Sequence, residues 1–342
     1  MTQTVFVTGA TGLLGNNLVR LLLAEGHCVR ALARSTEKAQ QQFADLAGSK
    51  LDIITGDMTD VAGFASSLTG CSLLFHTAAH FRASYTGGNH SARLSAVNVD
   101  GTRELLHAAH TAGIRRMVHV SSIAVLGHNA GGEVDENCLQ HNPSSVDDYY
   151  RSKMASDAVI FEFLERRPDM HISLVLPGWM HGPGDLGPTS AGQFVLDFLH
   201  RRLPGVVDSI SSMVDARDVA AVMLAAARQG RRGERYLAAG HAVPMADLMR
   251  TMEHLSGVPA PKRALPTWMV FMVAYMQEAY ARLSGKPVLL SLAMARTITS
   301  DYGRRFSATK IWQEFGLGFR PLEETLADEI AWYREAGWVK AD

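Results

Sequence analysis

TVFVTGATGLLG, residues 4–15, is the part of this 342-residue chain that most strongly indicates its fold. Thr4 to Thr8 form a β-branched, apolar run typical of a buried strand, and a helical pattern follows it. Gly9, Gly12 and Gly15 stand three residues apart where that helix begins. Such a turn lets the backbone approach a pyrophosphate, and the free N–H groups of the helix favour an anion. The pattern predicts a dinucleotide-binding turn; a glycine-rich loop without a ligand is the alternative.

Strands and helices alternate through the first half of the chain, which predicts repeated βαβ units. We therefore expect an α/β fold with a Rossmann-type, doubly wound parallel sheet, and a dinucleotide-binding domain over residues 1–176. The expected strands are Thr4–Thr8, Cys28–Ala33, Leu51–Thr55, Ser72–Thr77, Arg116–Val120 and His171–Leu176, and the expected helices lie near Leu13–Glu25, Glu37–Leu46, Arg93–Ala112 and Val146–Arg167.

The second half has a different pattern. PGWMHGPGDLGP, residues 177–188, is rich in glycine and proline, which predicts a loop over a site. The pattern after it is mostly helical, with short strands expected at Gly205–Val207 and Arg235–Ala239. We expect residues 177–342 to form a smaller, α-rich substrate lobe, some segments of which return to the first domain.

Charge and cysteine content narrow the class of protein. Lys and Arg number 33 against 34 Asp and Glu, so no overall field attracts nucleic acid, and a nucleic-acid partner is not expected. The three cysteines show no CxxC spacing, and the N-terminus lacks a secretory signal, so we expect a cytoplasmic protein. Trp268–Met276, the most apolar segment, is far shorter than the ~20 residues of a membrane span. Only Lys262 and Arg263 flank it, so membrane contact is not expected either.

No metal site is predicted. His76 and His80 have the spacing of a helical metal pair, but they straddle a strand end, where side chains alternate between faces. The chain contains no HExxH motif.

Eight short motifs, in order, resemble those of the extended branch of the short-chain dehydrogenase/reductases. The resemblance covers nearly the whole chain, because residues 306–337 are also similar to the C-terminal helices of that branch. The motifs are TGATGLLG (8–15), GDMTD (56–60), HTAAH (76–80), VNVDGT (97–102), VSSIAVLG (120–127), YYRSK (149–153), PGWMHGPGD (177–185) and VDARDVA (214–220).

The resemblance implies a nicotinamide cofactor, and the end of the second strand indicates which one. Ala33 stands where an NAD enzyme usually has an acid, whereas Arg34 and Ser35 could bind a 2′-phosphate. We therefore expect NADP(H) in preference to NAD(H); the alternative is a solvated Arg34. By resemblance, the other cofactor-binding residues are Gly9, Thr11, Gly12, Leu13, Leu14, Gly15, Asp57, Met58, Thr77, Ala78, Ala79, Asn98, Tyr149, Lys153, Pro177, Gly178 and Met180.

Tyr149 and Lys153 lie four residues apart on an expected helix, so their side chains share one face. A phenol of pKa ~10 needs a neighbouring positive charge to exchange its proton near neutrality. Tyr149 is then the general acid of a carbonyl reduction. Ser122, which matches the SSxxxxG pattern of the family, would hydrogen-bond the same oxygen. A surface helical pair and ordinary strand-end hydroxyls are the alternatives.

Three branches of the family are possible. Ile123 follows Ser122 where dehydratases have an acid, and the wall from Leu176 to Met180 is more apolar than that of nucleotide-sugar epimerases. The chain is most similar to carbonyl reductases of the dihydroflavonol reductase and 3β-hydroxysteroid dehydrogenase type. We predict NADPH-dependent reduction of a ketone or aldehyde on an apolar or aromatic small molecule, which His80, Ser122, Ile123 and Trp179 would line. The alternatives are a nucleotide-sugar epimerase and a non-catalytic NADP(H)-binding scaffold or sensor. The resemblance also implies a homodimer formed through the helices near Arg93–Ala112 and Val146–Arg167.

Overall fold

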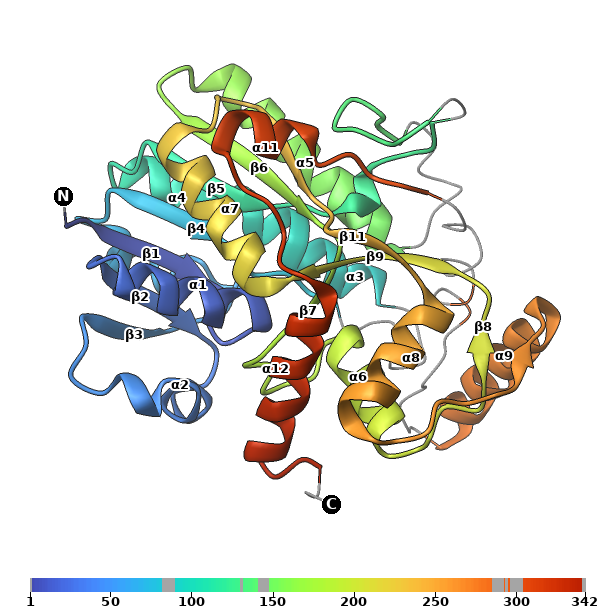
Figure 1. Ribbon diagram of the computed structural model, residues 1–342. Helices are drawn as coiled ribbons and strands as arrows, with labels where there is room; N and C mark the ends of the chain where they lie inside the picture. Colours follow the sequence, from blue (N-terminus) through green and yellow to red (C-terminus); the bar gives the residue numbers. More distant parts are fainter. Residues whose placement is uncertain are drawn as a thin grey trace.

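The computed structural model describes residues 2–81, 90–129, 132–140, 148–284, 292, 295 and 304–339. Its centre is a seven-stranded sheet with the order β10-β6-β5-β4-β1-β2-β3 (Figure 1). All its neighbouring strands pair in parallel, and the order runs outward from β1 in both directions, so the doubly wound Rossmann-type prediction is confirmed. The strands are β1 (Thr4–Thr8), β2 (Cys28–Ala33), β3 (Leu51–Thr55), β4 (Leu73–His76), β5 (Arg116–Val120), β6 (His171–Pro177) and β10 (Arg235–Ala238).

Helices cover both faces of this sheet because alternate strand residues point to opposite sides. Val5 and Val7 pack in a core shared with α1 (Leu13–Ala24) and α7 (Ala216–Gln229), whereas Phe6 packs on the other side. The first face also carries α2 (Thr36–Gln42) and α11 (Thr309–Phe315), and the second carries α4 (Gly101–Thr111) and α5 (Asp148–Arg166). Val146, the expected start of α5, lies outside the described residues.

The helix expected near Arg93–Ala112 is interrupted. It begins as α3 (Ser91–Leu94), widens into a π-helical segment over Ser95–Asp100, and continues as α4. Gly101 approaches the backbone of Met58 so closely that a Cβ would lie 2.4 Å from the Met58 carbonyl oxygen. The interruption coincides with this contact to a residue distant in sequence and with the hydrogen bonds of Asn98, described below. The hydrophobic spacing of the helix predicts neither the contact nor the hydrogen bonds.

The second lobe contains a small sheet that the sequence did not predict. It has the order β11-β9-β7, where β7 pairs parallel and β11 antiparallel to β9. β7 lies inside the expected loop and follows β6 across Gly178, where a Cβ would lie 2.5 Å from the Ala239 carbonyl oxygen. A residue with a Cβ would clash at this crossing between the two sheets, so glycine stands at position 178. The segment around it is rich in glycine and proline, which is why a loop was expected there. The strands are β7 (Trp179–His181), β9 (Ile210–Asp215) and β11 (His241–Pro244).

Helices complete this lobe. α6 (Ser190–Leu199), α8 (Met245–Ser256) and α12 (Leu322–Glu335) share a core with residues of β9 and β11. α9 (Thr267–Ser284) packs in a separate small cluster with a short parallel pair, β8 (Val206–Val207) and β12 (Ala264–Leu265), which lies beside it (Figure 1). In contrast, β10 and α7 from the same half of the sequence join the large sheet. In the described part of the chain, none of the helices combines the length and hydropathy of a membrane span.

Candidate active site

The glycine turn lies between β1 and α1 at the carboxyl edge of the large sheet. Gly9 has φ +67°, and a Cβ on it would lie 2.7 Å from the Ala78 amide nitrogen. A Cβ on Gly15 would lie 2.2 Å from the Gly9 carbonyl oxygen. The helix cap, Gly12, has no side chain to occupy the first N–H groups of α1, among them those of Leu13 and Leu14. This cradle has the shape and the open donors that a dinucleotide pyrophosphate requires.

The end of β2 supplies a positive charge but no acid. Arg34 and Ser35 follow Ala33 at exposed positions. The Ser35 hydroxyl accepts a hydrogen bond from Lys38 N at 3.1 Å and thereby caps α2. Partial burial acts against ionisation of Asp57, but hydrogen bonds from Thr59 and the charges of Arg34 and Arg93 together lower its pKa. Arg34 therefore lies close enough to Asp57, an expected cofactor-binding residue, to favour the ionised form of its carboxyl group.

The end of β4 is fastened to the glycine turn. Thr77 Oγ1 donates to the Thr8 carbonyl oxygen at 2.6 Å, and Ala78 N donates to Thr8 Oγ1 at 3.2 Å. These bonds place Thr77 and Ala78 against Gly9, and exposed Ala79 follows them.

Asn98 has a bracing role that the sequence reading missed. Its Oδ1 accepts from His80 N at 2.7 Å, and its Nδ2 donates to the His80 carbonyl oxygen at 3.1 Å and to Ser152 Oγ at 3.0 Å. The side chain is 2% exposed. Asn98 thus ties the chain after β4 to α5, and its side-chain amide is committed to the backbone of His80 and to Ser152.

Lys153 reaches from α5 to the end of β5. Its Nζ donates to the Val120 carbonyl oxygen at 3.0 Å, two residues before Ser122. Ser122 Oγ accepts from Ala124 N at 3.1 Å, at the start of a 3₁₀ turn (Ile123–Val125) that α5 contacts. Tyr149 lies one turn before Lys153, and its ring meets that of Phe81 edge-on with centroids 4.7 Å apart. The fold thus brings Ser122, Tyr149 and Lys153 to one end of the sheet.

Lys153 is 3% exposed, and burial lowers its pKa to about 8, with Asp157 acting in the opposite direction. Asp157 follows four residues later on the same face of α5 and is itself buried. Burial raises the pKa of Asp157, whereas the charge of Arg235, whose Nε lies 3.5 Å from Asp157 Oδ2, lowers it. The sequence reading missed both residues. The four-residue spacing from Lys153 could have indicated Asp157, but Arg235 comes from β10.

Two buried histidines lie beneath this site. His76 and His119 are paired across β4 and β5, with ring centroids 5.1 Å apart. His76 bonds Thr8 Oγ1 at 2.7 Å and Thr102 Oγ1 at 3.0 Å, and burial lowers its pKa to about 3. Burial also lowers the pKa of His119 well below its ordinary value. Both rings are neutral parts of the core. Among the described residues, no three His, Cys, Asp or Glu side chains are grouped to hold a metal ion.

The expected loop after β6 points its side chains in two directions. Trp179 Nε1 donates to Ser190 Oγ at 3.1 Å, and its ring packs edge-on against Phe194 and His181 in the second lobe. Met180 packs instead against the core of α1 and α7. Pro177 ends β6, and Gly178 forms the crossing. Ile123 packs at the border of the core beneath α4 and α5.

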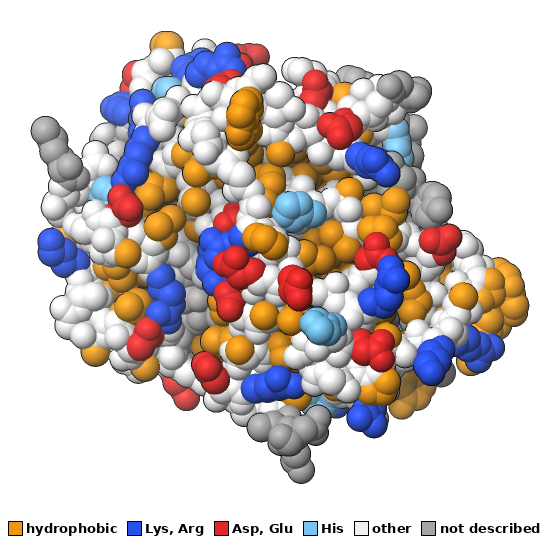
Figure 2. Space-filling model, in the orientation of Figure 1, with side chains coloured by type: hydrophobic (Ala, Val, Ile, Leu, Met, Phe, Trp, Pro, Cys, Tyr) orange, Lys and Arg blue, Asp and Glu red, His pale blue; other side chains and the backbone are white. Residues whose placement is uncertain are grey.

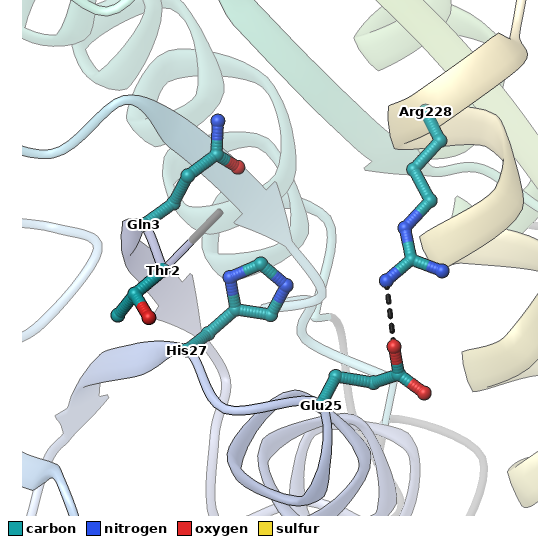
Figure 3. Close-up of a pocket in the computed structure, with 5 residues that line it drawn as sticks. All are labelled: Thr2, Gln3, Glu25, His27 and Arg228. Carbon is teal, nitrogen blue, oxygen red and sulfur yellow. Dashed lines mark hydrogen bonds and ion pairs between the residues drawn. The ribbon is translucent and has the colours of Figure 1, made fainter.

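A hollow of about 510 Å³ lies at the opposite, amino edge of the sheet (Figure 3). Arg228 faces Glu25 across it in an ion pair of 2.7 Å. Its lining residues, Thr2, Gln3, Glu25, His27 and Arg228, include none of the expected site residues. Ligands of open α/β sheets bind at the carboxyl ends of the strands, so this hollow is not the candidate active site.

Comparison with known proteins agrees with this geometry. Residues 5–239 match the model of the NAD dependent epimerase/dehydratase family. The chain is 35% identical over 339 residues to "Sterol demethylase protein B" of Methylococcus capsulatus, covering 98% of this chain and 100% of the relative. It is 33% identical over 346 residues to "Putative dihydroflavonol 4-reductase" of Synechocystis sp., and the match covers 99% of this chain and 97% of the relative.

A solved structure is similar over the same extent. The crystal structure of gox2253 is 30% identical, with a TM-score of 0.82, and the match covers 99% of this chain and 100% of that one. The family model spans more than half of the chain, and both named relatives match it from end to end. The chain therefore belongs to the NAD dependent epimerase/dehydratase family, whose members bind a nicotinamide dinucleotide.

Proposed function

We propose that this oxidoreductase reduces a ketone or aldehyde on an apolar or aromatic small molecule, with NADPH as the reductant. The observation that carries the proposal is the buried bond from Lys153 Nζ to the Val120 carbonyl oxygen. It holds the Lys153 ammonium at the end of β5, two residues before Ser122, and Tyr149, one helical turn before Lys153, would share this charge.

The glycine cradle and Arg34 would hold the cofactor. The pyrophosphate would lie on the N-terminus of α1, and exposed Arg34 would pair with a 2′-phosphate at the end of β2. The preference for NADPH is supported by Ala33, which stands where NAD enzymes usually have an acid. When bound, the reduced nicotinamide supplies the hydride.

Tyr149 would donate a proton to the substrate oxygen. Moving a phenol from a pKa of ~10 to near 7 requires about 4 kcal/mol of extra stabilisation of the phenolate. With a pKa of about 8, Lys153 carries its charge at pH 7, and the low polarity around it strengthens its attraction to a phenolate. Because Ser122 Oγ already accepts from Ala124 N, its own hydrogen can be donated to the same substrate oxygen.

The substrate class is supported by two independent features. The half-buried Trp179 brings apolar surface to the segment after β6, and the names of the two relatives refer to sterols and to a dihydroflavonol. A nucleotide-sugar epimerase is the second candidate, because the family model includes epimerases and such enzymes also use Ser, Tyr and Lys.

The decisive experiment measures NADPH consumption with a 3-ketosteroid, a dihydroflavonol and an aliphatic ketone, and includes Tyr149→Phe as the inactive control. We expect stoichiometric oxidation of NADPH with at least one apolar ketone. Interconversion of a nucleotide sugar without net NADPH consumption, and no activity on any ketone, would replace the proposal with the epimerase.

A further inference from the structure

Helix α9 exposes a stripe of large apolar side chains. Five of the seven large hydrophobic residues that are most exposed in the described chain lie on it. Their spacing of three and four places them on one helical face. Figure 2 shows apolar side chains at the right edge of the molecule, where Figure 1 places α9. This α9 stripe consists of Trp268 (65% exposed), Met272 (44%), Tyr275 (67%), Met276 (62%) and Tyr280 (56%).

The opposite face of α9 packs inward with small residues. Val270, Ala274 and Ala281 are at most 6% exposed. A helix that only covers a core places its largest apolar side chains inside, whereas here they face outward. Contiguous exposed apolar surface of this kind marks an interaction site.

Basic side chains gather at the N-terminal end of the stripe. Lys262 and Arg263 precede β12 and α9, and Arg201 and Arg202 precede β8, which pairs in parallel with β12. Both pairs therefore lie at the amino end of this strand pair, where Val206 N donates to the Arg263 carbonyl oxygen at 2.9 Å. All four side chains are exposed. Arg202 Nη1 lies 3.6 Å from Asp197 Oδ1, but the Arg202 side chain remains 57% exposed. The sequence reading counted only Lys262 and Arg263, because the two pairs lie about sixty residues apart in the chain.

Acidic groups offset only part of this charge, because exposed Asp208, which follows β8, is outnumbered by the four basic residues. Glu278 is the sole acid between residues 260 and 281, and its partly buried carboxylate accepts from Leu292 N at 2.8 Å. The surface therefore combines aromatic and methionine side chains with a basic end.

We infer that α9 docks on the surface of an anionic lipid bilayer. Trp and Tyr are the side chains that favour the headgroup region, because their rings are apolar and their N–H and O–H groups remain hydrated. Arg201, Arg202, Lys262 and Arg263 would lie on the lipid phosphates. A helix of this length and composition lies in the plane of the interface and does not span it.

A second copy of the chain is a poorer occupant of this surface. In a two-fold dimer the same patch would meet itself, and α9 would offer the partner's basic end one acid, Glu278, which already accepts a hydrogen bond from Leu292 N. The homodimer implied by the family resemblance also uses other helices, near Arg93–Ala112 and Val146–Arg167. The bilayer proposal concerns binding alone and does not rest on the proposed reaction.

The test is flotation of the full chain with vesicles of phosphatidylcholine, with or without phosphatidylglycerol. We expect the wild type to float with the anionic vesicles. Replacing Trp268, Tyr275 and Met276 together with glutamine should weaken this binding by roughly tenfold or more. Trp312→Gln on α11, where the indole is 67% exposed, is the matched control and should stay within about twofold of the wild type.

A second variant tests how much the basic side chains contribute to vesicle binding. Arg201→Glu with Arg202→Glu should weaken binding to anionic vesicles by about tenfold or more and leave binding to neutral vesicles unchanged. The proposal is overturned if the wild type does not float with anionic vesicles at low ionic strength, or if Trp312→Gln weakens binding as much as the stripe variant. It is also overturned if the stripe variant turns a dimer into a monomer while vesicle binding persists.

Discussion

Replacing Lys153 with methionine should change how stability depends on pH, because the wild-type ammonium is buried. Burial lowers the pKa of Lys153 from 10.5 to about 8. Between these two values the unfolded chain holds the proton and the folded chain does not, so the free energy of unfolding rises with pH. The shift corresponds to about 3 kcal/mol at ~1.4 kcal/mol per pKa unit. The methionine variant lacks this gain.

The assay is urea unfolding of both cofactor-free proteins, followed by circular dichroism from pH 7 to pH 10.5. From the lower to the higher pH, the wild type should gain about 3 kcal/mol relative to Lys153→Met. Other titrating groups are common to both proteins and cancel. Lys50→Met, at an exposed position, should follow the wild-type curve. A stability difference that does not vary with pH would show that Lys153 titrates as it does in the unfolded chain, and would refute the reasoning.

Three further substitutions test the cofactor site and its support. Arg34→Ala should raise the KM for NADPH by about tenfold or more and leave that for NADH nearly unchanged, and an equal effect on both in steady-state kinetics would refute the 2′-phosphate role. Gly9→Ala forces a Cβ to within 2.7 Å of Ala78 N at φ +67°, so calorimetric titration should detect no NADPH binding, and wild-type affinity would contradict the cradle. Asn98→Ala leaves the backbone groups of His80 without their partner and should cost about 1–3 kcal/mol in urea unfolding; a cost near zero would show that Asn98 does not brace this segment.

Local patterns predicted the parts of the site that local sequence determines. Gly12 and Gly15 are constrained by atoms of the turn itself, although Gly9 also meets Ala78, and the spacing of Tyr149 and Lys153 follows from helical geometry. Both the fold and the sheet edge that carries these residues could therefore be predicted.

The remaining features depend on contacts between distant parts of the chain. Arg235 reaches Asp157 because β10 pairs with β6. The π-helical segment before Gly101 accompanies a backbone contact with Met58, more than forty residues earlier. Likewise, Arg201 and Arg202 lie at the same end of the β8–β12 pair as Lys262 and Arg263 only because these two distant strands pair in parallel, which is why the basic end of α9 was missed.

Proton donation by Tyr149 is tested most directly by comparing Tyr149→Phe with Tyr150→Phe, its immediate neighbour, on the best apolar ketone. We predict that Tyr149→Phe lowers kcat by about 10²–10⁴-fold and leaves the NADPH Kd within about threefold of wild type. Tyr150→Phe should retain wild-type turnover. If Tyr149→Phe turns over the ketone at a rate close to that of the wild type, the phenol is not the acid and the account is wrong.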